Sequence, residues 1–171
     1  MTQDRKCNPA GFIKEVMSRC KTDTGYGATM RRADNPNLCS MAWEYLVPFC
    51  DLSNSIERLS FSLVGAAIAR EKPEQDGTEN IGAALRNICK GDKDSMERES
   101  KRLRRVIACD NVTELIPVLH PILQYIQSKG GSSLSYETLL KDLLFWREET
   151  RIRWTKDFYD KNEESSSKEE D

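Results

Sequence analysis

Basic side chains crowd into one short stretch of the chain. Five of the eight residues in this stretch are lysine or arginine, namely Arg98, Lys101, Arg102, Arg104 and Arg105. At about 100° per residue, a helix would place all of them except Arg104 in one narrow stripe. Cationic groups at one-turn spacing suit a phosphate backbone, which is a polyanion of similar charge spacing. The stretch is therefore a candidate nucleic-acid-binding surface.

The other side of the same helix is apolar. It carries Met96, Leu103, Val106 and Ile107. An apolar face of this kind seats a helix on a core and leaves the basic stripe outward. A solvated charged face explains an isolated charge run equally simply, and so the rest of the sequence must separate the two interpretations.

Two further groups of basic residues occur. Arg31 and Arg32 follow a glycine-containing loop, and the predicted last helix carries Arg147, Arg151 and Arg153. Arginine beside aromatic rings is typical of surfaces that hold single strands without reading sequence.

The aromatic candidates on that last helix are Trp146 and Trp154. A core position is the alternative for Trp146, because Leu139, Leu143 and Trp146 would share one helix face.

Charge is distributed unevenly along the 171 residues. The net charge is −2, which by itself argues against a nucleic-acid partner. The last twelve residues hold six acidic and two basic groups, so the remaining 159 residues carry +2. We expect residues 161–171 to form a disordered acidic tail. The chain has no run of 18 apolar residues and no apolar signal core near its start, so we expect a cytoplasmic protein without a membrane partner.

The sequence lacks the parts of a catalytic or metal site. Six cysteines are spread along the chain with no C-x-x-C pair, and His120 is the single histidine. No nucleophile elbow, phosphate-binding glycine loop or H-E-x-x-H motif occurs. We therefore expect reduced core cysteines, a core or capping histidine, no metal, no cofactor and no enzymatic activity.

Helical periodicity dominates, and no alternating strand pattern or hairpin signal is present. We predict an all-α fold, a helical bundle of two small subdomains without a sheet. The first would cover residues 1–90, and the second, with the basic helix, residues 91–160. The helices are expected at about residues 9–21, 38–49, 56–70, 80–89, 95–109, 113–127 and 136–159, with residues 22–27 as a loop.

Several of these segments together resemble one known family, the small subunit of the type I-E CRISPR surveillance complex, Cascade (the CasB family). The matching segments are, in chain order, Gly27-x-x-x-Arg31-Arg32 followed by Pro36, Trp43-x-Tyr45-Leu46-Val47-x-Phe49, Phe61-Ser62-Leu63, Ile81-Gly82-Ala83-Ala84-Leu85, the basic helix through Arg102, and Phe145-Trp146 followed by Arg151 and Asp157-Phe158. The resemblance covers roughly residues 10–159 and rests on the order and spacing of the segments.

The resemblance implies a non-catalytic helical protein that is present as a pair within the guide-RNA complex. It implies contacts with the backbone, large and second small subunits, with the target strand, and with the displaced non-target strand, and hence a role in stabilising the R-loop in antiviral defence.

The resemblance also assigns residues to nucleic acid. Arg31, Arg32 and Arg102 fall where the family has basic residues, and Arg151 aligns with another. The chain departs from the family pattern near Ala108, Asn111 and His120, where arginines are expected. We hypothesise that Lys101, Arg104 and Arg105 replace those charges one turn away.

Two other interpretations remain open from the sequence. One is a free-standing helical regulator of duplex DNA, although Asp92 and Asp94 would place acidic groups where a recognition helix enters the groove. The other is a structural adaptor whose basic stripe contacts only protein. A salt-dependent affinity for nucleic-acid strands would separate the adaptor from a strand-binding subunit.

Overall fold

The computed structural model describes residues 7–130 and 133–160, and within them the chain is all-α, as predicted. The expected acidic tail, residues 161–171, lies outside the described residues. The elements are α1 (Pro9–Thr22), α2 (Thr24–Met30), the 3₁₀ helix η1 (Cys39–Ala42), α3 (Trp43–Leu46), α4 (Ser55–Glu71), α5 (Ile81–Ile88), α6 (Lys93–Ile107), α7 (Val112–Ser128), α8 (Tyr136–Leu144) and α9 (Glu148–Tyr159).

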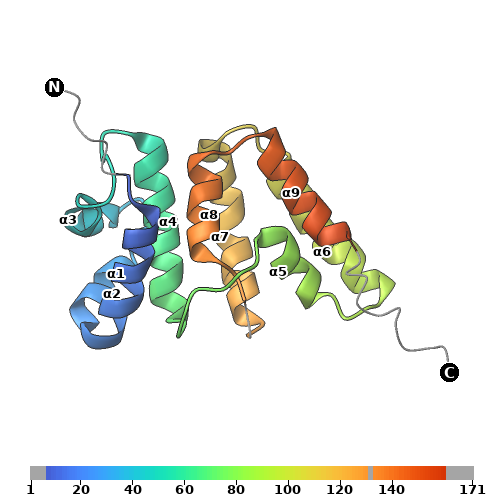
Figure 1. Ribbon diagram of the computed structural model, residues 1–171, viewed down its shortest axis with the longest axis horizontal. Coiled ribbons are helices and arrows are strands. Elements are labelled where there is room, and N and C mark those ends of the chain that lie inside the picture. The colour runs from blue at the N-terminus through green and yellow to red at the C-terminus, as the bar shows by residue number, and fades with distance from the viewer. Residues whose placement is uncertain (1–6, 131–132, 161–171) are drawn as a thin grey trace.

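The helices lie side by side along one long axis (Figure 1). Helices α1 to α4 form one side, α7 and α8 lie in the middle, and α5, α6 and α9 form the other side. Helix α4 packs on α1 and α2 and also on α7 and α8, which is why every residue from Ser60 to Ala69 is buried. Helix α5 precedes residue 90 in the chain and packs mainly on α9. One continuous apolar core therefore links the two sides.

Short polar side chains begin most of the helices. Each accepts a hydrogen bond from a backbone N–H of the first helical turn, which otherwise has no partner. These capping residues are Asn8, Asp23, Asn54, Asn80, Asp92, Asn111 and Ser135. Each such cap is worth about 1 kcal/mol, so helix starts are specified locally by the sequence.

The prediction of a loop over residues 22–27 was wrong, because the segment begins helix α2. The Asp23 carboxylate accepts a hydrogen bond from the Tyr26 N–H at 2.9 Å, and Tyr26 and Met30 are buried. A cap and two buried side chains thus outweigh the low helix propensity of Gly25 and Gly27.

The predicted continuous helix over residues 38–49 was also wrong. It is divided into η1 and α3, and a 3₁₀ turn has 3.0 residues per turn, which rotates the faces that follow it. Leu46 is buried, whereas Trp43 and Val47 are 38% and 54% exposed.

The predicted last helix over residues 136–159 is broken between α8 and α9. The Trp146 indole N–H donates to the Cys109 carbonyl at 2.9 Å, and the Thr150 hydroxyl donates to the Phe145 carbonyl. These contacts hold the connection, and the break lets α9 fold onto α5.

The α5–α9 contact supplies a prediction about stability. A Cβ atom on Gly82 would lie 1.9 Å from the Trp154 carbonyl oxygen, so Gly82→Ala forces the two helices apart. We expect it to lower the free energy of unfolding by about 3 kcal/mol in chemical denaturation. Gly25→Ala is the control, because its Cβ would meet the Asp23 carboxylate at an ordinary 3.5 Å. Equal stability of the two variants would contradict the packing described here.

Candidate nucleic-acid interface

Helix α6 presents the basic stretch that the sequence singled out. The Asp92 carboxylate caps the helix through the Ser95 N–H at 2.7 Å. Leu103 and Val106 are fully buried, and Met96 and Ile107 pack against the core while half-buried. The basic side chains Arg98, Lys101, Arg104 and Arg105 are exposed. The apolar side of the helix therefore faces the core as predicted, but Arg102, expected in the exposed stripe, is half-buried.

Arg102, the remaining member of the basic stretch from Arg98 to Arg105, is held inward by a buried carboxylate. Glu99 is 0% exposed and accepts a hydrogen bond from Arg102 Nη1 at 3.1 Å. It also accepts one from the Tyr125 hydroxyl of α7 at 2.6 Å, and the Arg102 guanidinium lies 3.8 Å from the centre of the Tyr125 ring. Arg98 approaches the same carboxylate, with Nε 3.8 Å from Oε1.

Burial raises the pKa of Tyr125, and the hydrogen bond to Glu99 raises it further. The phenol therefore stays protonated and remains a donor at neutral pH. Glu99 and Tyr125 form a buried support beneath the basic face. The sequence pattern did not reveal this pair.

The remaining cations of α6 differ in how they are paired. Lys101 contacts Glu97 one turn earlier at 3.1 Å, in an exposed pair of the kind that contributes little. Arg104 and Arg105 have no ion-pair partner among residues 7–130 and 133–160. These two guanidinium groups at the end of the helix are thus the ones most available to an anionic ligand.

Each basic residue of the group at α9 is paired with a carboxylate. Arg147 is exposed and lies 3.6 Å from the Glu149 carboxylate. Arg151 is half-buried and reaches the Ile107 carbonyl and the Asp110 carboxylate, each at 3.4 Å, which ties α9 to the end of α6.

Neither tryptophan of this region is a base-stacking surface. Trp154 is 0% exposed, so the prediction that it stacks on bases was wrong. Trp146 is half-buried against it, with ring centroids 5.0 Å apart, and its N–H is used within the fold. Trp154 belongs to the core and Trp146 packs against it, because the break in the helix between α8 and α9 turns α9 inward.

Arg153 and Trp154 share one carboxylate. Buried Asp142 of α8 accepts a hydrogen bond from the Trp154 N–H at 2.7 Å and pairs with Arg153, which is partly exposed. Burial raises the pKa of Asp142, while both of these contacts lower it, and the net direction is upward.

This balance gives a second prediction about stability. Asp142→Asn keeps an acceptor for the Trp154 N–H and removes a charge that burial disfavours, so we expect a loss below about 1 kcal/mol. Asp142→Ala leaves the buried N–H unpaired and should cost about 2 kcal/mol. Because the folded pKa is raised, ionisation of Asp142 destabilises the native protein as pH rises through that pKa. Thermal unfolding of the wild type and both variants at pH 4 and pH 7 tests this. Equal losses of stability in Asp142→Asn and Asp142→Ala would contradict the role of the Trp154 hydrogen bond, and losses that do not change with pH would contradict the raised pKa.

Arg31 and Arg32 lie in the other half of the molecule, directly after α2. Arg31 is half-buried beside Gly27, and Arg32 is exposed. The Arg31 carbonyl accepts a hydrogen bond from Arg70 of α4 at 3.3 Å.

The segment that follows Arg32 is anchored through the Asp34 carboxylate. The Asp34 carboxylate, 7% exposed, contacts Arg70 Nη2 at 2.7 Å and His120 Nε2 of α7 at 2.9 Å. His120 is therefore a polar link between the Arg31–Arg32 segment and α7 rather than a core residue.

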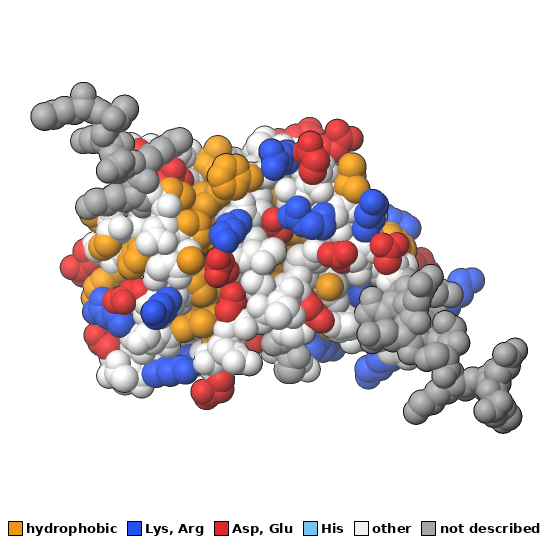
Figure 2. Space-filling model, in the orientation of Figure 1, with side chains coloured by type: hydrophobic (Ala, Val, Ile, Leu, Met, Phe, Trp, Pro, Cys, Tyr) orange, Lys and Arg blue, Asp and Glu red, His pale blue; other side chains and the backbone are white. Residues whose placement is uncertain are grey.

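The ten predicted site residues do not converge on one patch. Helices α2 and α6 lie on opposite sides of α7 and α8 (Figure 1). On the face shown in Figure 2, Lys and Arg side chains over α8 and α9 are mixed with Asp and Glu side chains. The arrangement suits an extended ligand that touches separated points, and it does not suit a compact anion.

The described parts of the chain contain no cluster of three or more His, Cys, Asp or Glu side chains that is able to hold a metal ion. Among the same residues, no helix has the length and apolarity needed to cross a membrane. The free thiols are Cys20, Cys39, Cys50, Cys89 and Cys109.

Comparisons with known proteins point to one family. The family model for the CRISPR-associated protein Cse2 matches residues 27–159. A comparison with curated protein sequences finds no significant match.

Three solved structures share the fold at low sequence identity. The structure of CasB from Thermus thermophilus has a TM-score of 0.67 and 18% identity, covering 90% of this chain and 98% of that one. A chain of a CRISPR RNA-guided surveillance complex has a TM-score of 0.71 and 20% identity, covering 88% and 90%. CasB from M. ruber has a TM-score of 0.69 and 19% identity, covering 88% and 92%.

Proposed function

The chain belongs to the CRISPR-associated Cse2 family, and we propose from this that it is the non-catalytic small subunit of a type I-E Cascade complex. In that role it binds the backbone of nucleic acid, both the target strand and the displaced non-target strand, and stabilises the R-loop. The observation that carries the proposal is the family match over residues 27–159 together with the unpaired Arg104 and Arg105 on the surface of α6.

The energetics of target recognition make such a subunit useful. Exchanging a DNA duplex for an RNA–DNA hybrid is nearly neutral in free energy, so protein contacts with the separated strands decide whether the R-loop persists. Each phosphate contact adds a salt-dependent contribution that does not depend on sequence. Arginines without a base-reading motif meet this requirement, because the guide RNA supplies the sequence specificity.

The separation of the basic groups supports an extended ligand. Helix α2, which Arg32 follows, and helix α6 lie on opposite sides of α7 and α8 (Figure 1). A strand that spans the molecule would therefore contact cations at both ends. The rigid supports are the Glu99–Tyr125 pair beneath α6 and the Asp34–Arg70–His120 cluster beside Arg32.

The partners under this proposal are the guide RNA, the backbone and large subunits, and a second copy of this chain. One of the three structures of similar fold is that of a CRISPR RNA-guided surveillance complex, which supports an assembly of this kind. The Asp92 and Glu99 carboxylates of α6 are occupied in structural contacts, which supports a binding role over a catalytic one.

The test is co-purification of the full chain with a tagged backbone subunit and a guide RNA, followed by native mass spectrometry. We expect recovery of the chain at two copies per complex. A complex that assembles in the presence of the chain but does not retain it would overturn the proposal and favour the free-standing regulator, for which selection of duplex-DNA sequences is the next experiment. If the chain joins the complex, but complexes with and without it bind the strands with the same salt dependence, the protein-only adaptor is favoured.

A further inference from the structure

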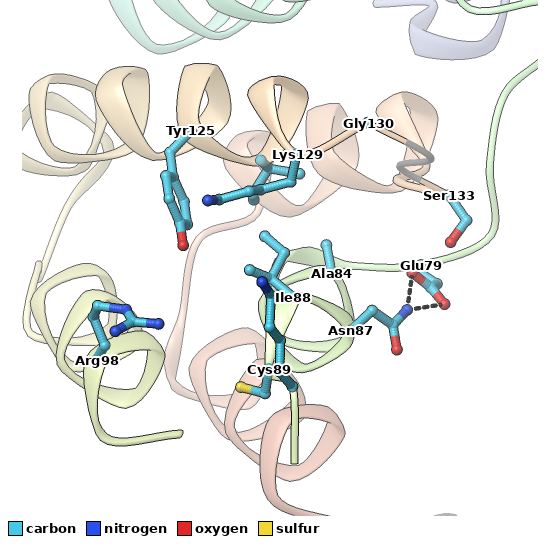
Figure 3. A pocket seen from close by; sticks show the side chains of 12 residues that line it. Glu79, Ala84, Asn87, Ile88, Cys89, Arg98, Tyr125, Lys129, Gly130 and Ser133 are labelled. Atoms are coloured by element: carbon cyan, nitrogen blue, oxygen red, sulfur yellow. Dashed lines mark hydrogen bonds between the residues drawn. The ribbon is translucent and has the colours of Figure 1, made fainter. Parts of the chain in front are cut away.

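A cavity of about 460 Å³ opens between α5, α6 and α7, outside the residues assigned to the strand-binding surface except Arg98. Figure 3 shows side chains from all three helices directed toward it. Its volume falls in the range of about 300–1,000 Å³ typical of small-molecule sites. A bare inorganic anion would fill only a small part of it.

The charged side chains that line the cavity favour an anion. Lys90, Arg98 and Lys129 are exposed cations at its edge, and Glu79 is the single carboxylate among its lining residues. Both Glu79 oxygens already accept hydrogen bonds from the Asn87 amide, at 2.7 and 2.8 Å. The three cations belong to different segments, so they surround the opening instead of forming one row.

The walls are partly apolar and fixed in place. Tyr125, Ile88 and Ala84 line the cavity beside the cations (Figure 3). The Tyr125 ring is oriented by its hydrogen bond to Glu99 and by the Arg102 guanidinium. An aromatic ring and aliphatic side chains next to basic groups can accommodate the flat, apolar face of a nucleobase.

We propose that this cavity binds one nucleotide of a single-stranded nucleic acid. The phosphate is held by Lys90, Arg98 and Lys129, and the base packs against Tyr125 and Ile88. This inference rests on the proposed function, which supplies the nucleic-acid strand as the ligand. Arg98 belongs both to the basic stripe of α6 and to the cavity, so a strand that follows α6 reaches the opening at its Arg98 end.

The site is tested directly with small probes on the isolated full chain. Amide NMR spectra are recorded with thymidine 5′-monophosphate, with thymidine, and with inorganic phosphate. We expect the monophosphate to shift signals of α5, Arg98 and the end of α7. Thymidine and inorganic phosphate should each bind with at least tenfold lower affinity. Equal effects of phosphate and nucleotide would reduce the site to a phosphate site and overturn the nucleotide assignment, and no shift at these residues would overturn the cavity as a site.

A strand experiment extends the test to the polymer. A thymidine oligonucleotide carrying 5-iodouracil is crosslinked by light, and we expect the crosslinked peptide to contain Tyr125. Lys90→Ala/Lys129→Ala should weaken oligonucleotide binding about tenfold or more and reduce the salt slope by about 0.7 for each phosphate group that the variant no longer neutralises. Lys14→Ala/Lys141→Ala removes the same charge from exposed positions away from the cavity and is the control.

The two proposals fail in different ways. If the chain joins the complex but crosslinks map only to α6 and α9, and the two double variants bind alike, the cavity proposal is wrong and the proposed function stands. If the chain does not join the complex but the monophosphate still shifts the cavity signals, the proposed function is wrong and the site remains.

Discussion

Arg104→Ala/Arg105→Ala is expected to weaken the hold of the assembled complex on its R-loop by about 100-fold, with little change in folding stability. Both guanidinium groups are exposed and unpaired among the described residues, so their removal leaves no buried partner behind. A hydrogen bond to a charged group contributes about 1.5 kcal/mol or more, and two such contacts correspond to about two orders of magnitude. R-loop dissociation is measured at several salt concentrations, and the salt slope should become shallower.

The matched control is Lys14→Ala/Lys141→Ala, which removes two exposed positive charges from α1 and α8. A general effect of net charge would weaken R-loop binding equally in both double variants. Full R-loop stability in Arg104→Ala/Arg105→Ala would contradict the hypothesis that these arginines take the place of the family's basic residues near Ala108, Asn111 and His120.

Glu99→Ala is expected to destabilise the protein by about 3 kcal/mol. The carboxylate is fully buried and joins Arg102 to Tyr125, and its removal leaves a guanidinium and a hydroxyl without their partner. Removing one member of a buried ion pair costs about 3–5 kcal/mol, and we take the lower end because the Arg102 side chain is 28% exposed and regains water. Chemical denaturation monitored by circular dichroism measures the loss.

Tyr125→Phe separates the role of the hydrogen bond from that of the ring. It keeps the surface under the Arg102 guanidinium and removes only the bond to Glu99, so we expect a loss of about 1 kcal/mol. If Glu99→Ala is no more destabilising than Tyr125→Phe, the Glu99 carboxylate does not hold α6 in place, and the Glu99–Tyr125 pair is not the support of the basic face.

Local signals made most of the fold predictable from the sequence. The capping residues Asn54, Asp92 and Asn111 and the apolar periodicity after each of them place α4, α6 and α7 to within a few residues. These signals depend on side chains near each helix start, so they need no knowledge of the tertiary structure.

The errors arose where long-range contacts decide the local structure. The break after α8 depends on Trp146 reaching the Cys109 carbonyl, 37 positions away in the sequence. Helix α2 forms despite two glycines because Tyr26 and Met30 are buried in a core that consists largely of residues from other segments. Propensity alone does not contain this information.

The candidate site was predictable only in its outline. The exposed face of α6 follows from the 3.6-residue period, but the inward position of Arg102 does not. A signal was available, because Glu99 lies between Met96 and Leu103 on the apolar side of the helix and a carboxylate there needs a partner. Its partner Tyr125 lies 26 residues away, and no local rule identifies it.

The most direct test of R-loop stabilisation by this chain is the lifetime of the R-loop in complexes assembled with and without it. The complexes share one guide RNA and one target, and single-molecule measurements record the lifetime at physiological salt. We expect a shorter lifetime without the chain, recovery when the wild-type chain is added back, and incomplete recovery with Arg104→Ala/Arg105→Ala. An R-loop that is equally long-lived in complexes with and without the chain would contradict this expectation.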